Sequence, residues 1–61
     1  MKRRELVRYL EQHGCRLLRE GSNDTLYVSP DERKVTTIPR DREINDYLAK
    51  KICRDLGVPE R

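Results

Sequence analysis

Two segments with the apolar spacing of an amphipathic helix enclose a middle stretch of short β-type segments, and this order limits the fold more than any other feature. In residues 2–13, apolar residues recur at three- and four-residue spacing, and Gly14 suits a helix end because glycine adopts the left-handed conformation at little cost. The same spacing returns in residues 42–56, with Asp41 as the expected N-cap. We therefore predict a helix at each end of the chain.

The middle of the chain has the composition of three short strands. The predicted strands are residues 15–20, 24–29 and 34–38, and the second is rich in the β-branched and aromatic residues that strands favour. Turn-forming residues separate them at 21–23 (GSN) and 30–31 (PD). Turns this short imply antiparallel strands in sequence order.

Two amphipathic helices need an apolar sheet face against which to bury. Alternation along the second strand places Leu26 and Val28 on one face and Thr25 and Tyr27 on the other, so we expect Tyr27 on the outer face. The predicted fold class is α+β in the order α-β-β-β-α, with a three-stranded antiparallel sheet and both helices on one face. This is the architecture of double-stranded RNA-binding domains.

The chain is short, and its charge is biased towards cations. We expect one domain, 1–61, with a small core, because a chain of this length buries only about 60% of its unfolded surface. Hydrophobic residues make up 34% of the chain, and Phe and Trp are absent, so we expect no cofactor pocket and no cofactor. The net charge is +3, and cations outnumber anions in the first third of the chain. This bias favours a polyanionic partner such as RNA or DNA, with an ordinary solvated surface as the alternative.

Cysteine and histidine give no sign of a metal site. Cys15 and Cys53 lack the spacing of a metal or redox motif, and His13 is the single histidine. We therefore expect no bound metal and reduced thiols. No apolar run exceeds three residues, so we expect no membrane span and a cytoplasmic protein.

Several short motifs resemble, in their joint order and spacing, the HicA-type toxins of bacterial toxin–antitoxin pairs. They are residues 1–6 (MKRREL), 10–15 (LEQHGC), 17–21 (LLREG), 37–40 (TIPR), 42–44 (REI) and 52–57 (ICRDLG). The resemblance implies a fold like that of double-stranded RNA-binding domains and a metal-independent mRNA endoribonuclease. It also implies a HicB-type antitoxin partner that covers the active surface.

The resemblance breaks at the position that matters most for the chemistry. The family pattern has a histidine at the start of the second strand, where this chain has Asp24, and commonly another before Arg42, where it has Asp41. Metal-independent cleavage takes a proton from the ribose 2′-hydroxyl and gives one to the departing 5′-oxygen, which suits histidine because its pKa lies near neutral pH. An aspartate side chain, with an unperturbed pKa of about 3.9, is a poor base and cannot act as an acid at neutral pH. We therefore expect weak or absent cleavage; a hydrogen bond to the turn amides is the alternative role of Asp24.

Six further residues are candidates for RNA binding, each with a solvated or structural role as its alternative. They are Arg3, Arg4 and Arg40 through phosphate contacts, Tyr27 through base stacking, and Ser22 and Asn23 from the turn. No base accompanies the Ser22 hydroxyl in the sequence, so a nucleophilic triad is not supported.

Two functions remain open at this point. The first is an RNA-cleaving HicA-like toxin that is attenuated or inactive because Asp24 stands at the histidine position. The second is a non-catalytic RNA-binding or antitoxin-binding module that keeps only the fold and the basic surface. An RNA-degradation assay of the chain beside an Asp24→His variant separates them.

Overall fold

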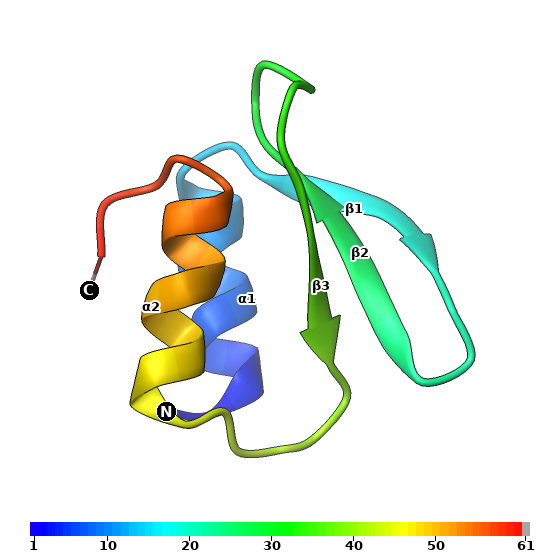
Figure 1. The fold of residues 1–61 in the computed structure, drawn as a ribbon, viewed down its shortest axis with the longest axis vertical. Coiled ribbons are helices and arrows are strands. Elements are labelled where there is room, and N and C mark those ends of the chain that lie inside the picture. Colours follow the sequence, from blue (N-terminus) through cyan, green and yellow to red (C-terminus); the bar gives the residue numbers. More distant parts are fainter. Residues whose placement is uncertain (61) are drawn as a thin grey trace.

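The computed structural model describes residues 1–60 and has the predicted order of elements; residue 61 lies outside the described part (Figure 1). The elements are α1 (Arg3–Gln12), β1 (Arg16–Glu20), β2 (Asp24–Val28), β3 (Val35–Pro39) and α2 (Asp46–Asp55). The strands form one antiparallel sheet in the order β1-β2-β3. Both helices cover the same face of this sheet, which confirms the predicted α+β architecture (Figure 1).

The two helices run in the same direction, and this orientation defines the end of the molecule that matters for function. The N-terminal ends of α1 and α2 lie at the end of the molecule where β3 finishes (Figure 1). The turn between β2 and β3 lies at the opposite end. Because β3 leads directly into the connection to α2, this connection crosses the end that holds both helix N-termini.

The inner face of β2 is the reverse of the one expected from the sequence. Thr25 and Tyr27 are buried towards the helices, opposite Ile38 and Thr36 of β3. The hydroxyl of Tyr27 donates a 3.3 Å hydrogen bond to Glu11 of α1, so the ring packs in the core while the oxygen keeps a polar partner. The expectation that Tyr27 lies on the outer face is therefore wrong. With 5% of its surface exposed, its ring cannot stack on a base.

The second helix begins later than the sequence predicted, because the preceding residues make a different set of hydrogen bonds. Asn45 is the N-cap of α2, and its Oδ1 accepts from the backbone nitrogen of Leu48 at 2.7 Å, so the assignment of Asp41 as N-cap is wrong. Residues 42–44 are not helical and pair with residues 1–3 through backbone hydrogen bonds. This pairing ties the beginning of α1 to the connection before α2.

The core lies between the helices and the inner face of the sheet. Most of its side chains are aliphatic, and they come from both helices, the strands and the connections. The core also contains the two cysteines, which are free thiols. The core residues are Leu6, Leu10, Cys15, Tyr27, Ile38, Ile44, Ala49, Ile52, Cys53, Leu56 and Val58. Burial raises the pKa of the Cys53 thiol and, with a further contribution from Cys53, that of the Cys15 thiol. Tyr47 of α2 lies away from this core and is 79% exposed.

Candidate nucleic-acid interface

A pocket of about 540 Å³ opens at the end of the molecule that holds the helix N-termini. Five cationic side chains and one carboxylate line it: Lys2, Arg3, Arg4, Arg40, Arg42 and Glu43. We call it the basic pocket. Three of its cations come from the start of α1, and two come from the connection between β3 and α2. The positive end of the α1 dipole lies at the same end of the molecule and adds to the attraction of these cations for anions.

Backbone pairing between two distant segments brings the walls of the basic pocket together. The Arg3 backbone nitrogen donates to the Arg42 carbonyl at 2.8 Å, and the Ile44 nitrogen donates to the Met1 carbonyl at 2.8 Å. Lys2 and Glu43 face each other across this short antiparallel bridge. The relative positions of the pocket's cations therefore depend on backbone hydrogen bonds as well as on their own side chains.

Arg3 joins three parts of the fold with one side chain. Its Nε donates to the carbonyl of Pro39 at 2.9 Å, and its Nη2 donates to Oγ1 of Thr25 at 3.0 Å. The planar guanidinium fork suits two acceptors in fixed positions, which a lysine ammonium would not match. Arg3 thereby fixes the start of α1 to the adjoining ends of β2 and β3.

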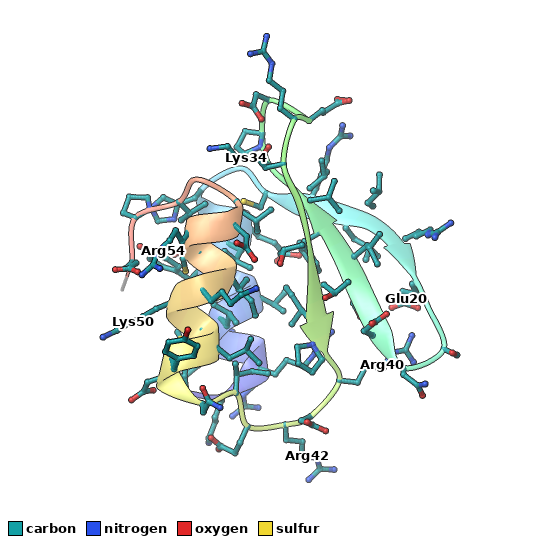
Figure 2. The ribbon with its side chains drawn as sticks, viewed as in Figure 1. Glu20, Lys34, Arg40, Arg42, Lys50 and Arg54 are labelled. Atoms are coloured by element: carbon teal, nitrogen blue, oxygen red, sulfur yellow. The ribbon has the colours of Figure 1, made fainter. Side chains whose placement is uncertain are left out.

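Arg40 makes the corresponding connection to the turn between β1 and β2. Its Nη2 donates to the Gly21 carbonyl at 2.6 Å and lies 3.9 Å from a carboxylate oxygen of Glu20. Glu20 and Arg40 lie at the same corner of the molecule in Figure 2. The turn that carries Ser22 and Asn23 is therefore held beside the basic pocket, and both of these side chains are exposed.

Asp24 is the first residue of β2 and lies at the same end of the sheet as the basic pocket. It pairs with Pro39, and it directly precedes Thr25, the partner of Arg3. Its backbone carbonyl accepts from the Gly21 nitrogen at 2.8 Å, and a Cβ at Gly21 would lie only 3.0 Å from its Oδ1. Glycine at 21 thus allows the close approach of the Asp24 carboxylate.

Asp24 is half-buried, and its carboxylate has no hydrogen-bond or ion-pair partner among residues 1–60. Neither an ion pair nor a hydrogen bond to the turn amides forms there, so the predicted Asx hydrogen bond is not seen. His13 lies at the C-cap of α1, at the other end of that helix from the basic pocket, where its Nδ1 is 3.0 Å from the carbonyl of Tyr9. The described part of the chain therefore places no imidazole beside residue 24.

The structure brings together some of the residues expected to bind RNA and separates others. Arg3 and Arg4 line one pocket together with Arg40, which is far from them in sequence, whereas Tyr27 does not reach it. Lys2 and Arg42 were missed. Their only sequence signal was that Lys2 begins the basic run at residues 2–4 and that Arg42 lies two residues after Arg40. The sequence prediction also placed Arg42 in the second helix, whereas the helix begins only at Asp46.

The chemistry available at this end of the molecule is that of anion binding. Arginine and lysine side chains bind phosphate oxygens, and backbone N–H groups at a helix N-terminus favour negative charge. Within residues 1–60, no group of three His, Cys, Asp or Glu side chains is placed to hold a metal ion. Neither α1 nor α2 is long and apolar enough to span a membrane.

Comparison with protein-family models matches residues 3–58 to the family described as the HicA toxin of bacterial toxin–antitoxin systems. The match covers α1, the whole sheet and α2, and it includes most of the residues that line the basic pocket. Searches among curated proteins and among solved structures gave no match. The extent of the family match decides the identity: the chain belongs to the HicA toxin family of bacterial toxin–antitoxin systems.

Proposed function

We propose that this chain is a HicA-type toxin that binds mRNA at the basic pocket and cleaves it slowly at most, because a carboxylate stands at the family's histidine position. The observation that carries the proposal is the placement of Asp24 at the same end of the sheet as five cationic side chains. Electrostatic attraction to phosphates supplies most of the sequence-independent affinity of a protein for nucleic acid. A phosphodiester bound at the pocket would thus lie close to residue 24.

The weakness of the proposed cleavage follows from the chemistry of the carboxylate. Cleavage without a metal requires one group to take the 2′-hydroxyl proton and one to protonate the 5′-oxygen, and a positioned histidine does both near neutral pH. An ionised carboxylate cannot donate a proton, and the charge of Asp24 also opposes the negative charge that develops on the phosphate. The loss of one acid–base residue typically lowers the rate about 10²–10⁴-fold.

A second candidate function is a non-catalytic module that binds RNA or an antitoxin through the same surface. The absence of an imidazole near residue 24 within residues 1–60 favours it. In both cases we propose a HicB-type antitoxin as the protein partner, as the family implies, and the cytoplasm as the compartment. Residual cleavage of RNA is expected only for the first candidate.

An RNA-cleavage assay of matched variants tests the proposal. The chain, Asp24→His and Asp24→Asn are incubated with labelled single-stranded RNA in the presence of a chelator. Gln12→His is the control, because it adds an imidazole at an exposed position at the last residue of α1, which is the other end of that helix from the basic pocket. We expect cleavage to rise about 10²–10⁴-fold in Asp24→His and in no other variant. Equal cleavage by the chain and by Asp24→His would refute the role assigned to residue 24.

A further inference from the structure

The five cations of the basic pocket fall into two groups according to their hydrogen bonds. Arg3 and Arg40 donate from their guanidinium groups to acceptors in the strands and in the turn before β2. The side chains of Lys2, Arg4 and Arg42 are exposed, and within residues 1–60 they have neither a hydrogen bond nor an ion pair. The pocket therefore contains two cations already used by the fold and three that are free to bind a ligand.

From this division we propose that Lys2, Arg4 and Arg42 hold the backbone phosphates of single-stranded RNA, whereas Arg3 and Arg40 maintain the shape of the pocket. The inference rests on the proposed function and names the residues that would carry its binding step. It also changes the set expected from the sequence, in which Arg3 and Arg40 were phosphate ligands and Lys2 and Arg42 had no role.

The cost of forming each phosphate contact favours the three unpaired cations. The Arg3 guanidinium keeps further N–H groups beyond those bonded to Pro39 and Thr25, but turning it towards a phosphate would break its bond to Thr25, whose side chain is buried, and a buried hydroxyl without its partner is destabilising. Lys2, Arg4 and Arg42 lose only water on binding. Their attraction for phosphate is therefore not offset by the loss of a bond within the protein.

Backbone hydrogen bonds hold these three cations close together, at the start of α1 and in the segment paired with it. Lys2 is the N-cap residue of α1, but its side chain makes no capping hydrogen bond to the helix. Arg4 lies in the first turn of that helix. Arg42 is held across from the start of α1 by the hydrogen bond from the Arg3 nitrogen to its carbonyl. Because backbone bonds fix the Cα positions, the three side chains can turn towards a phosphate without disturbing the fold.

Binding measurements with charge-matched variants test this assignment. The probe is a short fluorescein-labelled 2′-O-methyl RNA of mixed sequence, because the methyl group blocks the attacking hydroxyl and prevents cleavage. Fluorescence anisotropy gives Kd over a series of KCl concentrations, and circular dichroism melts verify that each variant is folded. The pocket variant combines Lys2→Gln, Arg4→Gln and Arg42→Gln. The control variant also replaces one lysine and two arginines that have no ion pair within residues 1–60 and lie outside the basic pocket: Arg8→Gln, Arg33→Gln and Lys50→Gln.

The expected effect follows from counterion release. Each phosphate contact to a single strand contributes about 0.7 to the slope of log K against log salt, which is about fivefold in affinity near 0.1 M salt. We expect the pocket variant to bind about a hundredfold more weakly and its slope to fall by about 2. The single substitution Arg42→Gln should lower the slope by about 0.7. The control variant should keep the slope of the unmodified chain.

The outcomes separate a failure of this inference from a failure of the proposed function. If the unmodified chain binds the RNA but the pocket variant keeps its slope, or if both triple variants weaken binding equally, the assignment of the three cations is wrong, whereas RNA binding by the chain, which the proposed function requires, stands. If the unmodified chain does not bind the RNA even at low salt, the proposed function and the inference both fail.

Discussion

Replacement of Arg3 by lysine should destabilise the fold although it keeps the charge. The guanidinium makes two part-buried hydrogen bonds, at 2.9 Å to the Pro39 carbonyl and at 3.0 Å to Thr25 Oγ1. These bonds connect α1 to the ends of β2 and β3, which are its neighbours in space but lie more than twenty residues away in sequence. A lysine ammonium can replace at most part of this arrangement, because it lacks the planar fork.

The magnitude follows from the number and type of the lost bonds. A hydrogen bond from a charged donor contributes about 1.5–3 kcal/mol to stability. Because Arg3 is only half-buried and lysine can restore part of one hydrogen bond, we expect Arg3→Lys to lower the free energy of unfolding by about 2 kcal/mol. A domain of this size is stable by about 3–9 kcal/mol in total, so the effect is a substantial fraction of its stability.

Urea denaturation followed by circular dichroism measures this loss, and a double-mutant cycle assigns it. The cycle combines Arg3→Lys with Thr25→Val, which removes the buried acceptor hydroxyl while it keeps the side-chain shape. We expect a coupling free energy of about 1 kcal/mol between the two positions. A loss below about 0.5 kcal/mol for Arg3→Lys, as is usual for exposed surface substitutions, would refute the structural role of this arginine.

Three further predictions concern the pocket, the second helix and the buried ionisable groups. Glu43→Gln should strengthen RNA binding several-fold in the anisotropy assay, because it removes the carboxylate that lines the basic pocket among residues 1–60; unchanged or weaker binding would contradict the placement of phosphate there. Asn45→Ala should lower the free energy of unfolding by about 1 kcal/mol through loss of the α2 N-cap, and a neutral result would speak against that cap. Stability should fall as pH rises above about 9, because the pKa values of Cys15, Cys53 and Tyr27 are raised in the fold, mainly by burial. These groups therefore ionise first in the unfolded chain, and a urea midpoint that stays constant across this pH range would exclude them as the cause.

The order of the elements could be predicted because local patterns decide it. The three- and four-residue spacing around Leu6 and Leu10 is that of a helix, and the turn residues at 21–23 separate two strands. Gly14 ends α1 as expected: it has a φ of +87°, and a Cβ there would meet Pro30 at 2.9 Å. Each of these signals lies within a few residues of the feature that it predicts.

The inner face of β2 and the start of α2 depend on contacts that no local pattern contains. In β2, Leu26 and Val28 alternate with Thr25 and Tyr27, and either pair could face a core. The structure places Tyr27 on the helix side, where its hydroxyl donates to Glu11 of α1. The start of α2 is delayed because residues 42–44 pair with residues 1–3 at the other end of the sequence. Local propensity alone favoured a longer helix.

The candidate site was only partly accessible from the sequence for the same reason. Arg3, Arg4 and Arg40 were recognised as cations, but nothing in the sequence shows that Arg3 and Arg40 bind the protein itself. Lys2 and Arg42 become candidates only once the bridge between the two distant segments is known. The cations that bind the protein itself could therefore be told from the others only by the hydrogen bonds of the folded chain.

The most direct test of the account is an NMR titration of the isotope-labelled chain with the 2′-O-methyl RNA. We expect the largest amide shift changes at residues 2–4, 24–25 and 40–43, because these segments surround the basic pocket and the strand end beside it. Shift changes confined to residues 29–34, at the opposite end of the molecule, or to the outer face of the sheet would contradict the binding of RNA next to residue 24.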